Sequence, residues 1–174
     1  TPNPTYEECC SGRSGHTEGV KVVYNPEKIS FVDILRWMWE AHDPCSGMGQ
    51  GNDRGTQYRS GIYPHSQAQR EVAEACLAAI GPPDGARAGA TVKTEVEGVA
   101  RWWDAEDYHQ QYLAKPGARP YCSAQPTGVP VPDDFLKENG AKLSAGYWKK
   151  YGPRPGCTIQ VSNEPVPVEE ALQA

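Results

Sequence analysis

Long hydrophobic runs are missing from this sequence, and that shortage excludes one broad class of protein. No apolar window approaches the about 20 residues that a helix needs to cross a bilayer, and no segment has the pattern of a signal peptide. Basic runs are also missing, because Lys and Arg are scattered and the formal net charge is -5. We therefore expect neither a membrane nor a nucleic acid as a partner.

Cysteine is sparse, with six residues in a chain of 174, and its spacing is irregular. This is not the dense pattern of a disulfide scaffold. The one Asn-x-Ser/Thr pattern has Pro4 in the middle, so it cannot accept an N-linked glycan. A reducing compartment with redox-active thiols fits best, which predicts a cytoplasmic or organellar (plastid or mitochondrial) location. Any targeting peptide would precede Thr1.

The sequence contains cysteine and histidine side chains of the kinds that bind zinc. The members of such a zinc site would be Cys9, Cys10, His16, His42 and Cys45. The sequence has no Cys-x-x-Cys pair and no His-x-x-x-His pair, which are the spacings typical of structural zinc. We therefore expect no metal.

Hydrophobic periodicity predicts strands and helices that alternate along the chain. The strands are expected at residues 20–24, 60–63 and 91–97. Capping-box patterns at Ser30 and Ser66 begin two helices, and the helices are expected at residues 31–41, 66–80, 106–115 and 133–139. Cys76 lies on the apolar face of the second. Strands and helices at these lengths indicate an α+β or α/β fold.

The most distinctive stretch is residues 49–59, in which three glycines occur within seven residues. This density of glycine predicts a tight loop, with Asp53, Gln57, Tyr58 and Arg59 projecting to one side. From these residues alone, a polar site and an ordinary surface turn are equally good interpretations.

The segment Gln-Gly-Asn-Asp-x-Gly-Thr-Gln-Tyr-Arg-Ser at residues 50–60 resembles the signature of the peptide methionine sulfoxide reductase A family. Further blocks resemble the same family in its order and spacing, at residues 1–8, 10–12, 15–18, 42–44 and 105–113. Together they extend from residue 1 to about residue 128. Several blocks in register are a far stronger signal than any one of them.

The resemblance implies an α+β fold: a two-layer sandwich with a central mixed sheet flanked by helices and a ferredoxin-like core. A long irregular C-terminal segment, rich in Pro and Gly, follows. We expect residues 1–131 to form the reductase domain, truncated at its N-terminal end, and residues 132–174 to be an extension of unknown role.

The resemblance also assigns roles to five side chains. Glu18 would be the acid that protonates the sulfoxide oxygen, and the hydroxyls of Tyr6 and Tyr58 would stabilise the charge developing there. Asp53 would hold the substrate backbone or a water molecule, and His109 would line the same pocket. Taken alone, a glutamate before a strand is more often solvated and a tyrosine is more often packing. A structural histidine is about as common as a functional one.

Two cysteines are expected to recycle the enzyme. Cys122 lies where the family carries its resolving cysteine, and a thiol on flexible chain can condense with a sulfenic acid to a disulfide. The position of the second recycling cysteine is Val131, and we expect Cys157, in a Pro/Gly-rich setting, to replace it. The plain alternative for Cys122 is a free cysteine in a tail. Thioredoxin would be the reductant, and no organic cofactor is implied.

The family's nucleophile lies in a Gly-Cys-Phe-Trp segment before the Thr-Pro-Asn-Pro block, and this sequence contains no such segment. The chain begins at Thr1 without an initiator Met, so we expect a processed chain or a fragment that is inactive alone. The predicted activity is thiol-dependent reduction of methionine (S)-sulfoxide, in oxidised proteins, peptides or the free amino acid, by a monomer. The alternative is a catalytically dead module that binds methionine sulfoxide or serves as an interaction domain.

Overall fold

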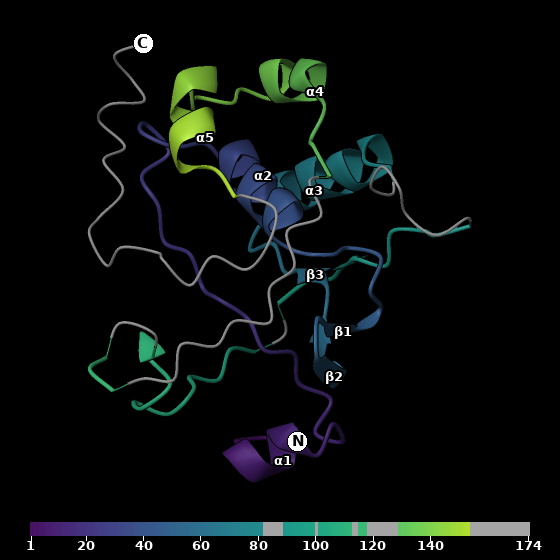
Figure 1. The fold of residues 1–174 in the computed structure, drawn as a ribbon, viewed down its shortest axis with the longest axis vertical. Coiled ribbons are helices and arrows are strands. Elements are labelled where there is room, and N and C mark those ends of the chain that lie inside the picture. The colour runs from purple at the N-terminus through teal and green to yellow at the C-terminus, as the bar shows by residue number, and fades with distance from the viewer. Residues whose placement is uncertain (82–88, 100, 113–114, 118–128, 154–174) are drawn as a thin grey trace.

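The computed structural model describes residues 1–81, 89–99, 101–112, 115–117 and 129–153, and these residues form an α+β fold. Helices α2, α3, α4 and α5 gather at one end of the molecule, and helix α1 lies at the opposite end (Figure 1). The strands lie between the two ends. The predicted class is therefore confirmed. No helix within the described ranges is long and apolar enough to span a membrane.

Two long helices begin where the sequence predicted. Helix α2 (Phe31–Ala41) starts at Ser30, whose hydroxyl accepts from Asp33 N while the Asp33 carboxylate accepts from Ser30 N. Helix α3 (Gln67–Ala79) starts at Ser66, whose side chain accepts from Gln69 N. Each cap satisfies backbone N–H groups that the first helical turn leaves unpaired.

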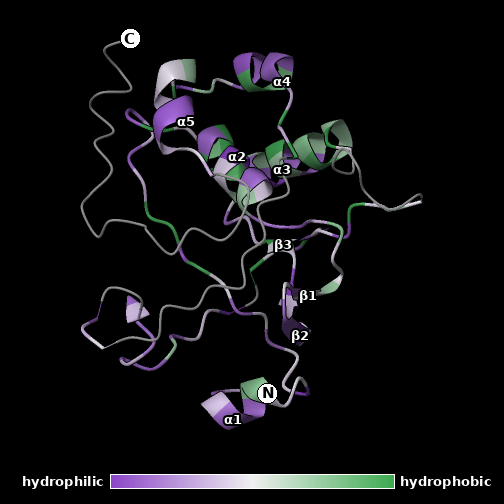
Figure 2. Cartoon of the chain, in the orientation of Figure 1, coloured by the Kyte–Doolittle hydropathy of each residue, from purple (hydrophilic) through white to green (hydrophobic). Residues whose placement is uncertain are grey.

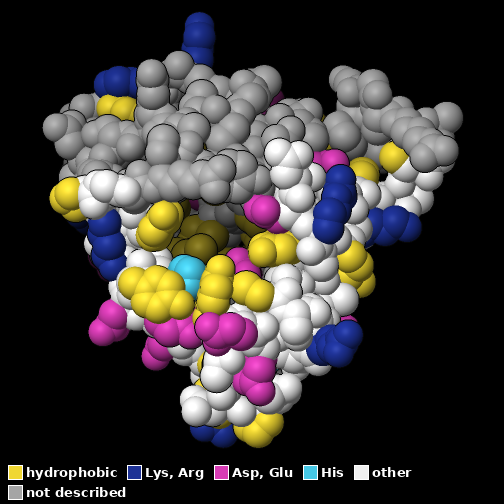
Figure 3. Space-filling model, turned by 60° about the horizontal axis from the view of Figure 1, so that its bottom comes forward, with side chains coloured by type: hydrophobic (Ala, Val, Ile, Leu, Met, Phe, Trp, Pro, Cys, Tyr) yellow, Lys and Arg dark blue, Asp and Glu magenta, His cyan; other side chains and the backbone are white. Residues whose placement is uncertain are grey.

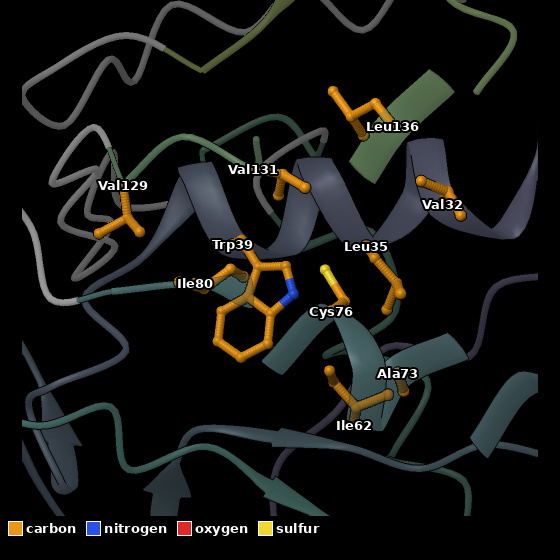
Figure 4. Close-up of a cluster of buried hydrophobic side chains, with 10 residues drawn as sticks. All are labelled: Val32, Leu35, Trp39, Ile62, Ala73, Cys76, Ile80, Val129, Val131 and Leu136. Atoms are coloured by element: carbon orange, nitrogen blue, oxygen red, sulfur yellow. The ribbon is translucent and has the colours of Figure 1, made fainter. Parts of the chain in front are cut away.

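The core forms where α2 and α3 pack together. Its central side chains are Val32, Leu35 and Trp39 from α2 and Ala73 and Cys76 from α3 (Figure 4). Trp39 and Cys76 have no exposed surface, and burial raises the pKa of the Cys76 thiol to about 12. Figure 2 shows hydrophobic residues along both helices, which also carry hydrophilic ones. The expected inward placement of Cys76 is confirmed.

The chain after residue 128 also packs against α2. Val129, Val131 and Leu136 belong to the same core cluster, and Leu136 lies in helix α4 (Asp133–Glu138), which was predicted. Helix α5 (Ala145–Tyr151), which was not predicted, brings Trp148 against Trp37. The described part of the C-terminal region thus contributes to the core, while the boundary near residue 131 stays a prediction.

The described strands form two small sheets. Strand β1 (Met48–Gln50) pairs antiparallel with β2 (Asp53–Arg59), and strand β3 (Gly61–Ile62) pairs parallel with β4 (Glu95–Val96). The loop predicted over residues 49–59 is therefore wrong in part. Its glycines allow a hairpin, because Gly51 adopts a φ of 55° in the turn and the register shifts between Met48 and Gly49.

Two predicted elements are not observed. Residues 20–24 have the composition of a strand, but they pair with no described segment, and Val20 and Val23 are about nine-tenths exposed. Residues 106–112 form consecutive turns in place of a helix, and Gln111 has a φ of 51°, which interrupts α-helical backbone. The predicted strands at 60–63 and 91–97 are present, but each is only two residues long.

Helix α1 (Tyr6–Cys10) is not among the helices that the sequence predicted. The Thr5 side chain accepts from Glu8 N, and the Glu8 carboxylate accepts from Thr5 N. This capping box stabilises one short turn of helix at the N-terminal end of the chain. It fixes the direction in which Tyr6 and Cys10 leave the backbone.

Candidate active site

The candidate site is built around the carboxyl group of Glu18. Its backbone N–H donates to Gln57 O at 2.9 Å, which attaches residue 18 to strand β2. Desolvation raises the pKa of Glu18, and Asp53 raises it further, while His109 acts in the opposite direction. Glu18 as a whole is an exposed residue, and the desolvation comes from protein atoms packed around its carboxyl group. Glu18 therefore holds its proton to higher pH than an ordinary glutamate.

Tyr58 reaches the same place from β2. Burial is the largest of the causes that raise the pKa of its hydroxyl, and the charges of Glu18 and Asp53 raise it further. Asp53 begins the same strand and is half-buried. A raised pKa keeps the phenol protonated, so that it can donate a hydrogen bond to a ligand oxygen.

Tyr6 comes from the other side of the site, on α1. Its ring lies 5.0 Å from the His109 ring and 6.4 Å from the Tyr108 ring, between centroids. A hydrogen bond with Cys10, together with the charge of that thiol when ionised, raises the pKa of Tyr6 to about 12. Tyr58 raises it as well, so the two phenols interact electrostatically.

His109 lies in the turns after residue 106 and packs against two aromatic rings. Its ring centroid is 4.3 Å from that of Tyr108. Its Nε2 atom is buried without a hydrogen bond to any described residue, and the nearest carboxylate oxygen, Glu106 Oε2, is 3.9 Å away.

The structure brings together five of the seven residues proposed from the sequence, Tyr6, Glu18, Asp53, Tyr58 and His109. Cys122 and Cys157 lie outside the described residues. Figure 3 shows the end of the molecule that carries α1, where hydrophobic and acidic side chains gather around a hollow with a histidine at its edge. Within the described ranges, no group of three or more His, Cys, Asp or Glu side chains could hold a metal ion.

Three residues support the site although the sequence analysis assigned them no catalytic or binding role. Cys10 was matched only as part of a block, yet its thiol contacts Tyr6. The Gln57 side chain is buried and donates to Cys10 O at 3.4 Å. Arg59 donates hydrogen bonds to the backbone carbonyls of Gly15 and His16, and so holds the segment that leads to Glu18. All three had a signal, since Gln57 and Arg59 lie in the Gly-rich block and Cys10 lies in the block at residues 10–12.

These side chains define a class of site. A carboxylic acid of raised pKa, two phenols and an imidazole converge where a polar oxygen could be bound and protonated. Such a set of donors is suited to substrates in which an oxygen gains negative charge as its bond to a neighbouring atom breaks. The site is thus suited to binding a polarised oxygen.

Comparison with known proteins identifies the family. Residues 1–139 match the family model described as peptide methionine sulfoxide reductase. Since this match covers most of the chain, the chain belongs to that family.

Relatives and solved structures agree with the assignment. The chain is 52% identical over 132 residues to peptide methionine sulfoxide reductase MsrA of Vibrio cholerae, covering 76% of this chain and 62% of the relative. It is 53% identical over 133 residues to MsrA of Azorhizobium caulinodans, covering 76% and 60%. The chain therefore spans less than two thirds of the length of these relatives.

Two solved structures have the same fold. Reduced Mxr1 from Saccharomyces cerevisiae superimposes with a TM-score of 0.60 at 31% identity, covering 76% of this chain and 70% of that one. Methionine sulfoxide reductase A of Corynebacterium diphtheriae gives 0.58 at 41% identity, covering 76% and 67%.

Proposed function

We propose that this protein reduces methionine (S)-sulfoxide to methionine, in oxidised proteins, peptides or the free amino acid. The observation that carries the proposal is the convergence of Glu18 with Tyr6 and Tyr58, an acid of raised pKa beside two phenols. The membership of the chain in the peptide methionine sulfoxide reductase family supports the same substrate.

The chemistry follows from the polarity of the sulfoxide. A thiolate attacks the sulfur, and the sulfur–oxygen bond of the substrate breaks as electrons move onto oxygen. Glu18 delivers a proton to that oxygen, while hydrogen bonds from Tyr6 and Tyr58 stabilise its charge. The oxygen departs as water and leaves a sulfur–sulfur bond between the thiol sulfur and the methionine sulfur. Water then attacks the thiol sulfur, methionine leaves with the electron pair of the sulfur–sulfur bond, a proton is released, and the thiol remains as a sulfenic acid. The thiol is thereby oxidised by two electrons and the substrate is reduced by two.

Two side chains would hold the substrate during this step. Asp53 lies beside Glu18 and Tyr58, where it could accept a hydrogen bond from the substrate backbone or from a water molecule. Nε2 of His109, which has no hydrogen bond to a described residue, would complete the polar wall. The exposed rings of Tyr6 and Tyr108, 43% and 54% accessible, offer an apolar surface to the methionine stem.

Recycling would follow from the remaining cysteines. We propose that Cys122 condenses with the sulfenic acid, forming a disulfide and releasing water, and that Cys157 passes the disulfide on to thioredoxin. A reducing compartment suits this exchange. We also propose the two-layer arrangement with a central mixed sheet and a ferredoxin-like core for the complete fold, with residues 1–131 as its reductase domain.

The test is turnover by the native gene product on a peptide that contains methionine (S)-sulfoxide. Mass spectrometry would follow the loss of one oxygen, with dithiothreitol as the reductant. The Glu18→Gln variant should be about 100-fold slower, because the proton donor is lost. The matched variant Glu97→Gln, at an exposed glutamate outside the site, should turn over at the parent rate. Binding of the (S)-sulfoxide without any reduction would support a binding module instead.

A further inference from the structure

The segment that carries Glu18 has no regular secondary structure, so its position depends on contacts with other elements. The guanidinium group of Arg59, at the end of β2, donates to His16 O at 3.3 Å and to Gly15 O at 3.4 Å. It also donates to Thr56 O at 2.8 Å. One side chain therefore joins residues 15–16 to the strand that supplies Tyr58.

A second contact holds Thr17, the residue next to Glu18. The Tyr63 hydroxyl lies 2.9 Å from Thr17 Oγ1 and 2.6 Å from Glu95 Oε1. A phenol has one proton, which it gives to the carboxylate because that is the stronger acceptor. Thr17 then donates its own proton to the Tyr63 oxygen, in agreement with the direction in which each partner moves the pKa of Tyr63.

Glu95 joins these two contacts into one network. Its Oε1 atom accepts from Tyr63 and also from Arg59 Nε, at 2.8 Å. Burial alone would raise the pKa of Glu95, but the hydrogen bonds from Tyr63 and Arg59 outweigh it and lower the pKa. The carboxylate therefore stays ionised at neutral pH. It lies in β4, so the network connects β2, the residue after β3, and β4 to residues 15–17.

We propose that Arg59, Tyr63 and Glu95 are positioning residues for Glu18. They hold residues 15–17 against the strands, and the bond from Glu18 N to Gln57 O completes the attachment. The carboxyl of Glu18 is thereby kept beside Tyr58 and Asp53 from β2 and His109 from the turns after residue 106, the groups that face it. None of the three positioning residues contacts the reacting oxygen in this scheme. The inference rests on the proposed function, in which Glu18 is the proton donor.

The most informative variant is Tyr63→Phe, which keeps the ring and removes the hydroxyl that joins Thr17 to Glu95. The matched control is Tyr24→Phe, whose hydroxyl has a single long contact with Gln69 at 3.4 Å. The measurement is the titration of the Glu18 carboxyl carbon by NMR in the 174-residue chain. In Tyr63→Phe the midpoint should move down toward that of an ordinary glutamate, because a loosened segment exposes the carboxyl to water.

Two further variants extend the test. Arg59→Lys retains the charge but cannot bond to Glu95 and to several carbonyls at once, so it should move the Glu18 midpoint in the same direction. Thr17→Val removes only the hydroxyl of a surface segment, and it decides the question if Arg59→Lys does not fold. Affinity for a peptide with methionine (S)-sulfoxide should fall about 5- to 10-fold in each variant, which corresponds to about one hydrogen bond.

The results separate the two proposals. A Glu18 midpoint unchanged in both Tyr63→Phe and Thr17→Val, with the fold intact, would overturn the positioning role while leaving the proposed function in place. A midpoint that moves in these variants but not in Tyr24→Phe supports the role. If the parent chain binds no sulfoxide peptide, the proposed function fails, and the Glu18 titrations still decide whether the network positions this residue.

Discussion

The two ends of this molecule are held together by different forces. At the helical end, α2 and α3 bury apolar side chains such as Val32, Leu35 and Trp39, each at most 2% exposed. Toward the end that carries α1, where β2 lies, side chains such as Arg59 and Gln57 donate hydrogen bonds to backbone carbonyls. Burial gives stability over a broad area, whereas directed hydrogen bonds place particular groups. Stability is therefore concentrated at the helical end, and the proposed chemistry lies toward the other.

The largest expected effect is loss of the central core side chain. Trp39→Ala should lower the free energy of unfolding by about 3–5 kcal/mol, because it leaves a cavity between α2 and α3. Urea unfolding followed by circular dichroism would measure it. The control is Trp102→Ala, at a ring that is 39% exposed, which should cost far less. Equal losses in the two variants would remove the distinction between the ends.

A second large effect is expected at Asp33, a buried carboxylate that joins α2 to the chain before α5. It accepts from Ser30 N, Ser30 Oγ and Lys142 N on Oδ2, and from Leu143 N on Oδ1. Asp33→Ala should lower the free energy of unfolding by about 2–4 kcal/mol, because four donors lose their acceptor. Asp134→Ala, at a side chain that is 91% exposed, is the control and should have little effect. An unchanged denaturation midpoint in Asp33→Ala would show that these four hydrogen bonds contribute nothing to stability.

The substitution Glu18→Gln should lower activity but raise stability at pH 7. Its pKa is raised in the folded state by burial, so the folded chain binds this proton more tightly than the unfolded chain. Stability is therefore lost as pH rises from the ordinary glutamate pKa through the raised one. Glu18→Gln should remove that loss and increase stability at pH 7. Thermal unfolding at pH 4 and pH 7 would measure the change, and a Gln variant less stable than the parent at pH 7 would contradict it.

The smallest effect concerns His42, where the helical end meets the strands. Nδ1 lies 2.6 Å from Met38 O, and Nε2 lies 2.7 Å from Ser60 Oγ. Burial lowers the pKa of His42, so the unfolded chain binds a proton at this residue more tightly than the folded chain does. Stability should fall as pH drops below about 6.5, and His42→Gln should weaken that dependence. The same substitution at exposed His65 should leave the pH dependence of unfolding as it is in the parent.

Elements with local signals could be predicted from the sequence, and elements that depend on distant partners could not. The Ser30 capping box and the apolar face that follows it are contained in a dozen residues, so α2 was predictable. The Thr5–Glu8 box was equally visible and would have revealed α1. Residues 20–24 have strand composition, but a strand needs a partner elsewhere in the chain. The turn at Gln111 depends on a positive φ, which cannot be predicted from a glutamine side chain.

The candidate site shows the same limit. Tyr6, Glu18, Tyr58 and His109 come from four separate segments, and their spacing in the sequence says nothing about their distance in space. The family resemblance suggested the group, and the fold brings its members together. The network of Arg59, Tyr63 and Glu95 needed coordinates, because Tyr63 and Glu95 lie outside the quoted motifs.

The most direct test of the central claim is calorimetric binding of three matched peptides, with methionine (S)-sulfoxide, methionine (R)-sulfoxide or methionine, between pH 4 and pH 9. The parent chain should prefer the (S)-sulfoxide, and its affinity should fall as pH rises through the raised pKa of Glu18, because the donor to the sulfoxide oxygen is lost. In Glu18→Gln this fall should disappear. Equal affinity for the sulfoxide and methionine peptides at every pH would contradict a site built to bind and protonate the sulfoxide oxygen.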